Sequence, residues 1–285
     1  MLYYIFYPLR EIWFGFNIFK YVTFRAAFAA ISAFILCVVF GPPAIKLFSA
    51  MKVRERTFRP AAPALHKFHA GKSGTPTMGG ILIVASIVFS TLLWARLDNS
   101  YVWLAIVVTL WLGVIGFIDD YIKLKRKKTD GLRALTKFSG QVVIGLAVAL
   151  FLYFSSSEAG LLYFPFFKKL ILDLGIFYVF FVIIVIAGAS NAMNLTDGLD
   201  GLAIGCVVMI AATYSAISYV TGHFELSGYL GTPFVPQASE VSVFCAAVLG
   251  SSLGFLWFNS HPASIFMGDT GSLALGGAMG TVAVL

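Results

Sequence analysis

Long apolar blocks dominate this sequence and decide what it can fold into. A helix needs roughly 20 mostly apolar residues to cross a bilayer, and several blocks here reach that length. Because every backbone polar group must be satisfied inside lipid, the blocks are predicted to be helices. The predicted fold class is an all-α polytopic integral membrane protein with about eight transmembrane segments, at residues 24–45, 77–95, 101–118, 138–157, 174–193, 202–221, 241–258 and 272–285.

The charge content supports this prediction. Of the 285 residues, 59% are hydrophobic and only 12% are charged, whereas soluble domains carry about 25% charged residues. So few charges leave too little polar surface to cover a water-soluble globule, and this class of protein is excluded.

The two ends of the chain differ from its middle. Residues 1–23 are crowded with aromatic side chains, which favours an interfacial N-terminal segment. Residues 24–285 are predicted to form a single transmembrane domain. The final apolar block, 272–285, is short for a span, so we expect the sequence to be a C-terminally truncated part of a longer chain with at least one further segment.

Basic residues gather in two of the linkers between the apolar blocks. Linkers 46–76 and 119–137 hold 14 of the 20 lysines and arginines, and they fall on the same side if each block crosses once. Cytoplasmic loops carry an excess of basic residues. This side is therefore predicted to be cytoplasmic, and the N-terminus is predicted to lie outside.

Acidic residues are few, and five of the 13 fall in three short motifs. Asp119 and Asp120 follow the third apolar block, Asp197 and Asp200 lie in a glycine-containing turn, and Asp269 lies in Gly-Asp-Thr-Gly. The count of crossings places all three on the basic side. Carboxylates suit Mg²⁺, lysines suit phosphate, and glycine turns before helices suit anions. The combination indicates phosphoryl transfer.

Each motif alone also has a purely structural interpretation. An Asp-Asp pair at a helix end is most often a solvated cap, and an Asp-Gly turn is common. Carboxylates near the hydrocarbon also fit a secondary transporter, although transporters place their sites near the bilayer midplane and often contain internal repeats. The joint occurrence of the motifs on one face is what favours an enzyme.

Taken together, the motifs resemble those of the phospho-N-acetylmuramoyl-pentapeptide-transferases, the MraY translocases of bacterial peptidoglycan synthesis. The Asp-Asp pair and the Asn-Leu-Thr-Asp-Gly run are shared with the wider superfamily of polyprenyl-phosphate sugar-1-phosphate transferases. The Gly-Thr-Pro-Thr-Met-Gly-Gly stretch and the order of the blocks are similar to this family in particular. The segments that carry the resemblance are 72–80, 116–123, 194–202, 253–259 and 266–277.

The resemblance implies a reaction and a set of site residues. UDP-N-acetylmuramoyl-pentapeptide and undecaprenyl phosphate would give lipid I and UMP, with Mg²⁺ as cofactor. Asp119, Asp120 and Asp269 are implied to be catalytic; Asp269 would be the metal ligand, and Asp119 would deprotonate or orient the lipid phosphate. Substrate binding is implied for Lys72, Thr77, Lys123, Lys137, Asn194, Asp197, Leu199, Asp200, Asn259 and Phe266, the last as a ring stacked on the base.

The resemblance also implies a setting for the site. The protein would be a homodimer in the bacterial inner membrane, with cytoplasmic loops at 46–76, 119–137, 194–201 and 259–271 and no role for nucleic acid. The family has about ten helices and a His-rich loop after the eighth, and this chain ends before that loop. A related N-acetylglucosamine-1-phosphate transferase would keep the same aspartates and remains the alternative enzyme.

Overall fold

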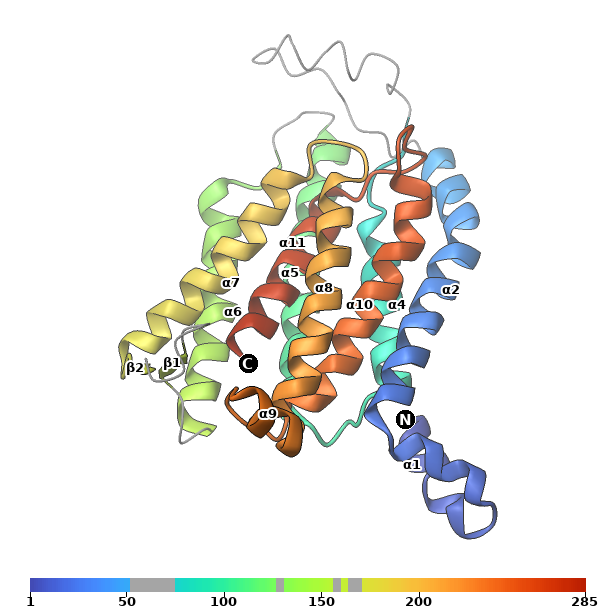
Figure 1. The fold of residues 1–285 in the computed structure, drawn as a ribbon. Coiled ribbons are helices and arrows are strands. Elements are labelled where there is room, and N and C mark those ends of the chain that lie inside the picture. Colours follow the sequence, from blue (N-terminus) through green and yellow to red (C-terminus); the bar gives the residue numbers. More distant parts are fainter. Residues whose placement is uncertain (52–74, 127–130, 156–159, 164–170) are drawn as a thin grey trace.

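The computed structural model describes residues 1–51, 75–126, 131–155, 160–163 and 171–285. Each of the eight predicted segments contains a helix, which confirms the all-α polytopic fold (Figure 1). These helices are α2 (Val22–Ala50), α4 (Gly80–Trp94), α5 (Ser100–Arg126), α6 (Ala134–Ser155), α7 (Phe177–Thr196), α8 (Leu202–Thr221), α10 (Ala238–Asn259) and α11 (Gly268–Val284).

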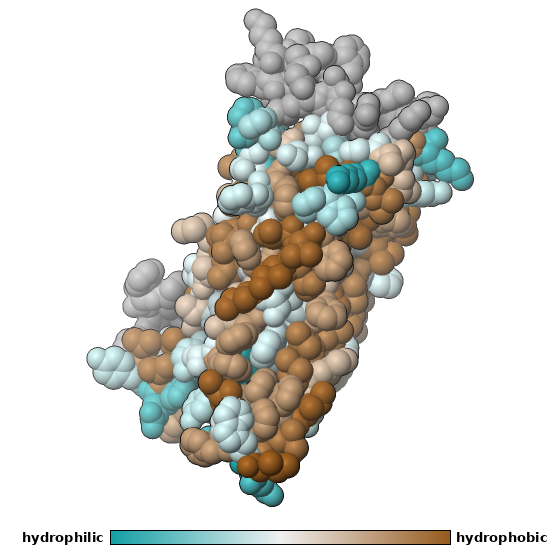
Figure 2. All heavy atoms as spheres, turned by 90° about the vertical axis from the view of Figure 1, so that its right-hand side faces the viewer, coloured by the Kyte–Doolittle hydropathy of each residue, from teal (hydrophilic) through white to brown (hydrophobic). Residues whose placement is uncertain are grey.

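The helices differ in length and in how deeply they are buried in the bundle. Within the described residues, α2, α5, α6, α7, α8 and α10 are long and apolar enough to cross a membrane. Helices α4 and α11 have 15 and 17 residues, and α11 is buried along nearly its whole length between α5 and α7. Its run of Gly, Ala, Ser and Thr side chains lets the neighbouring helices approach closely. A hydrophobic belt covers the lateral face seen in Figure 2, and polar side chains gather towards both of its ends.

Helix α5 continues past the predicted end at residue 118 to Arg126. Lys123 lies one turn after Asp119 and pairs with it at 2.7 Å, a spacing that stabilises a helix. The Asp-Asp pair therefore lies inside a helix, with its backbone already hydrogen-bonded, and not in the loop that follows.

Several short elements were not predicted from the sequence. The N-terminal segment contains α1 (Leu2–Phe6) and the 3-10 helices η1 (Pro8–Glu11) and η2 (Phe14–Lys20), with Trp13 63% and Phe14 81% exposed. Strands β1 (Leu161–Tyr163) and β2 (Ile171–Asp173) pair antiparallel, with Leu162 opposite Leu172. Helix α9 (Phe224–Leu230) connects α8 to α10. Each element is too short for hydrophobic periodicity to reveal it.

The connections divide between the two ends of the bundle. Figure 1 shows the N-terminus, the β1–β2 hairpin and α9 at one end. The end of α5, the turn between α7 and α8, and the start of α11 lie at the other, which we call the site end. The three acidic motifs are thus at the same end, as the count of crossings predicted.

A buried ion pair fixes the opposite end. Arg25 of α2 donates two hydrogen bonds to Glu240 of α10, at 2.6 and 2.5 Å, and Arg25 is 1% and Glu240 6% exposed. Glu240 also accepts a bond from the backbone nitrogen of Arg96 at 3.1 Å. The pair joins α2 and α10 to the loop that follows α4, because neither charge can be left unpaired in this apolar setting.

Replacing Arg25 by Met should lower the free energy of unfolding by about 3–5 kcal/mol, because Glu240 then stays buried without its partner. The double variant Arg25→Met/Glu240→Leu should recover most of that loss. Thermal unfolding in detergent measures both effects. The exposed Arg96–Asp98 pair supplies the control, since Arg96→Met should cost about 1 kcal/mol or less. Equal stability of Arg25→Met and the unchanged protein would contradict this assignment.

Candidate active site

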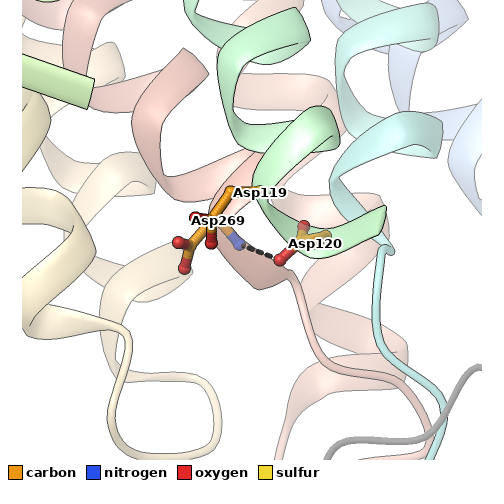
Figure 3. A group of neighbouring side chains, drawn as sticks. All are labelled: Asp119, Asp120 and Asp269. Carbon is orange, nitrogen blue, oxygen red and sulfur yellow. Dashed lines mark hydrogen bonds between the residues drawn. The ribbon is translucent and has the colours of Figure 1, made fainter. Parts of the chain in front are cut away.

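The site forms where the last turns of α5 cross the first turn of α11. A Cβ atom on Gly116 would lie 2.2 Å from the backbone oxygen of Asp269, so only glycine permits this crossing. The crossing brings Asp119 and Asp120 of α5 next to Asp269 of α11 (Figure 3). One oxygen from each of the three carboxylates lies within 4.8 Å of the others.

Asp119 is fully buried and has three polar neighbours. Its carboxylate lies 2.7 Å from Lys123 Nζ and 3.0 Å from Lys137 Nζ, and it accepts a bond from the backbone nitrogen of Leu132 at 2.6 Å. Lys137 comes from the first turn of α6. The residue Leu132, just before α6, and the first turn of α6 are thereby held against Asp119.

Asp269 contacts the same two lysines. Its Oδ2 lies 3.0 Å from Lys123 Nζ and 2.5 Å from Lys137 Nζ. Asn194, in the last turn of α7, donates to Asp269 Oδ1 at 3.0 Å and to Ser272 Oγ at 2.9 Å. Four helices therefore converge on this carboxylate, and the two ammonium groups lie where they can also meet phosphate oxygens.

Asp120 has different neighbours from Asp119, although the two residues are adjacent. Its carboxylate accepts bonds from the backbone nitrogens of Asp269 and Thr270, at 3.2 and 3.0 Å, and from the Thr270 hydroxyl at 2.7 Å. Figure 3 shows it apart from the other two carboxylates, beside the backbone of Asp269. Asp120 is thus bound to the start of α11.

The carboxylates suit a hard divalent cation. Mg²⁺ is held by oxygen ligands about 2.0–2.1 Å away, usually one or two carboxylates plus substrate phosphates and water. Oxygens within 4.8 Å of one another can reach one such ion after small side-chain rotations. Asp269 is the most accessible member, with 16% of its side chain exposed against none of Asp119, so it is the best placed of the three to meet an ion and a soluble substrate.

The other predicted residues form a rim around this centre. Asn259 donates to the carbonyl of Ile265 at 2.9 Å and accepts from the nitrogen of Gly201 at 3.1 Å. Asp200 accepts from the nitrogen of Ala263 at 3.2 Å and lies 3.1 Å from His261 Nδ1. These two residues therefore fasten the turn after α7 to the segment between α10 and α11.

A third rim contact involves the segment before α4. Phe266 donates its backbone N–H to the carbonyl of Pro76 at 2.8 Å and accepts from the nitrogen of Gly79 at 2.9 Å, and its ring is half-buried. Thr77 is buried in this segment. On the α7–α8 turn, Leu199 is 52% exposed and Asp197 is half-buried. Lys72 falls outside the described residues.

Thr270 and Ser272 were not predicted as site residues, yet both bind site side chains. The signal was present, because both belong to the Gly-Asp-Thr-Gly-Ser motif that contains Asp269. Their hydroxyls lie one and three residues after Asp269 on the first turns of α11, where they meet α5 and α7.

Comparisons with known proteins show the class and the family of this chain. The "Glycosyl transferase family 4" profile matches residues 102–285, and together with the fold and the site it defines the protein as a polytopic membrane transferase. Signature 1 of the phospho-N-acetylmuramoyl-pentapeptide-transferases matches residues 72–84.

Curated relatives match along the whole chain. Proteins named phospho-N-acetylmuramoyl-pentapeptide-transferase from Citrifermentans bemidjiense and Geobacter sp. (strain M21) are each 48% identical over 287 residues, which cover 100% of this chain and 78% of the relative. The namesake from Endomicrobium trichonymphae is 49% identical over 289 residues, with the same coverage. The chain belongs to the phospho-N-acetylmuramoyl-pentapeptide-transferase family.

Replacing Gly116 by Ala should lower the free energy of unfolding by about 1–3 kcal/mol, because the added methyl group collides with the backbone of α11. Gly113→Ala, one turn earlier on the same helix, is the matched control, since its nearest neighbours would lie at ordinary contact distances of 3.6 Å and beyond. Thermal unfolding of both variants in detergent tests this contact. Equal losses at the two positions would show that the close crossing does not matter.

Proposed function

We propose that this protein transfers phospho-N-acetylmuramoyl-pentapeptide from UDP-N-acetylmuramoyl-pentapeptide to undecaprenyl phosphate, forming lipid I and releasing UMP, with Mg²⁺ as cofactor. The names of the relatives give the group that is transferred, and the resemblance of the motifs implies the donor, the acceptor and the metal. The observation that supports this reaction in this chain is a shared set of contacts. Asp119 and Asp269, from two different helices, contact the same two lysines. Carboxylates for a cation beside ammonium groups for phosphates match the needs of this chemistry.

The reaction is a displacement at phosphorus. An oxygen of the lipid phosphate attacks the β-phosphorus that bears the sugar, and a new P–O bond forms. The bond from that phosphorus to the bridging oxygen breaks, and UMP leaves with the electron pair. Asp269 would hold Mg²⁺, whose chemistry there is to neutralise the pyrophosphate and stabilise the leaving UMP.

The residues of this chain do the positioning. Asp119 deprotonates or orients the lipid phosphate, and Lys123 and Lys137 contact the phosphate oxygens that share their side of the site. Asn194 holds Asp269 in place. The rim formed by Asp197, Leu199, Asp200, Asn259 and Phe266 receives the nucleoside, with the Phe266 ring stacked on the base. Thr77 and Lys72 complete the substrate-binding set.

Direct attack is favoured over a covalent aspartyl-phosphate intermediate. Asp119 is fully buried, and its oxygens contact two lysines and the backbone nitrogen of Leu132. Acting as a nucleophile, it would have to give up these contacts in the step that forms the intermediate. Isolation of a phospho-enzyme at Asp119 or Asp269 would overturn this choice.

The site end is proposed to face the cytoplasm of a bacterium, with the N-terminus on the outer side of the inner membrane. Lys123 and Lys137 lie at this end, and the basic linkers 46–76 and 119–137 connect helices there. A cytoplasmic excess of basic residues is the usual orientation of a membrane protein, and UDP-linked substrate would reach the site from water. A homodimer remains a prediction.

The proposal is tested by reconstituting the full chain with undecaprenyl phosphate and comparing two nucleotide sugars. We expect UMP release and a labelled lipid product with UDP-N-acetylmuramoyl-pentapeptide, loss of turnover with a chelator, and recovery on addition of Mg²⁺. Transfer from UDP-N-acetylglucosamine alone would favour the related sugar-1-phosphate transferase. Ion-coupled solute flux in liposomes without any transfer would favour the transporter.

Asp119→Asn and Asp269→Asn should each lower kcat by about 100-fold or more, since each removes a charge that faces the reacting phosphates. Both variants should remain folded, as judged by size-exclusion chromatography and thermal unfolding. Asp98→Asn is the matched control, because Asp98 lies in the loop between α4 and α5 at the opposite end and pairs with Arg96. Near-normal turnover of both site variants would refute the proposed roles.

A further inference from the structure

We propose that Asp120 is a positioning residue that fixes the start of α11, and so sets where the Asp269 carboxylate lies, while Asp119 and Asp269 meet the substrates. This inference deepens the proposed function and rests on it for the identity of the substrates. It separates the two members of the Asp-Asp pair, both of which the resemblance implied to be catalytic.

Helix α11 has no N-terminal cap from the residue that precedes it. The first N–H groups of a helix have no partner within the helix, and a side chain of the preceding residue usually supplies one. The residue before α11 is Met267, and its side chain makes no capping hydrogen bond. Asp120, from α5, accepts bonds from the N–H groups of Asp269 and Thr270 instead.

The Asp120 carboxylate that caps α11 is buried and tightly enclosed. Asp120 is 5% exposed. A Cβ atom on Gly268 would lie 2.8 Å from Asp120 Oδ2 and 3.1 Å from Thr77 Oγ1, and Gly268 has a φ of 76°, which favours glycine. The chain therefore turns into α11 directly against the carboxylate. A negative charge at a helix N-terminus is also stabilised by the helix dipole.

The division of contacts between Asp119 and Asp120 follows from helix geometry. Consecutive residues of an α-helix point about 100° apart, and in this structure Asp119 and Asp120 contact different partners. Asp119 reaches Lys123 and Lys137. Asp120 binds the backbone N–H of Asp269. The side chain of Asp269 contacts those same two lysines. Moving the start of α11 would therefore move the Asp269 carboxylate relative to both ammonium groups.

Thr270 provides an independent probe of this role. Its hydroxyl donates to Asp120 Oδ2 at 2.7 Å, and the residue is 3% exposed, so it contacts the cap and is shielded from a soluble substrate. If Asp120 were itself a metal ligand, Asp120→Asn would cost far more affinity than Thr270→Val, because a direct bond to the metal would be lost and not only its orientation. A positioning carboxylate needs the hydroxyl to keep its orientation.

The experiment measures Mn²⁺ binding to purified variants by electron paramagnetic resonance. The single variants are Asp269→Asn, Asp120→Asn, Thr270→Val and Thr270→Ser. The double variant is Asp120→Asn/Thr270→Val. We expect Asp269→Asn to abolish binding. Asp120→Asn and Thr270→Val should each weaken it by about tenfold, the effect of losing a hydrogen bond to a charged group. Thr270→Ser should restore near-normal affinity, and the double variant should be no weaker than Asp120→Asn alone. Asp173→Asn, on the distant hairpin, controls for removal of a carboxylate.

The results that overturn the inference are equally specific. If Asp120→Asn removes Mn²⁺ binding as completely as Asp269→Asn, Asp120 is itself a ligand; if Thr270→Val binds like the unchanged protein, the hydroxyl does not hold the carboxylate in place. Either result overturns the inference. This readout needs no turnover, so it is distinct from failure of the proposed reaction. Where transfer is observed, kcat should fall in the same order as metal affinity, with the shape of the pH profile unchanged. If Asp120→Asn does not fold, Mn²⁺ binding by Thr270→Val and Thr270→Ser still tests whether the Thr270 hydroxyl is needed.

Discussion

The structure depends on the contact between the end of α5 and the start of α11. This one crossing places a buried carboxylate against an uncapped helix terminus and brings a second helix's aspartate within reach of two lysines. It is possible only because Gly116 lets the backbone of Asp269 approach closely. The same close packing that stabilises the bundle therefore also assembles the charged centre. A substitution that alters this packing should also alter the positions of the charged groups.

The electrostatics of this centre follow from the same crossing. Isolated charges near hydrocarbon are costly, yet three carboxylates lie together here. Lys123 and Lys137 compensate two of them, and the N–H groups at the start of α11 compensate the third. A cluster in which every carboxylate has a charged or N–H partner can persist at the edge of a membrane, whereas three unpaired carboxylates could not.

Much of the fold could be predicted from the sequence, because apolar blocks of sufficient length have few alternatives in a bilayer. The gathering of three acidic motifs at one end followed from counting crossings. The direction of each carboxylate could not be predicted, since the extension of α5 to Arg126 determines which way Asp119 and Asp120 point. The Arg25–Glu240 pair was also missed, because the two residues are distant in sequence and neither belongs to a motif.

The membrane places a constraint on the backbone of the rim segment that precedes α4. Helix α4 has 15 residues and is about 22 Å long, shorter than the roughly 30 Å hydrocarbon core, so its two ends cannot both reach the membrane surface. Irregular backbone at that depth must be hydrogen-bonded within the protein. The bonds from Phe266 to Pro76 and from Gly79 and Gly80 back to Phe266 and Met267 meet this requirement. These bonds join the start of α4 to the start of α11, so the close packing at the site end leaves none of the backbone groups named here without a partner.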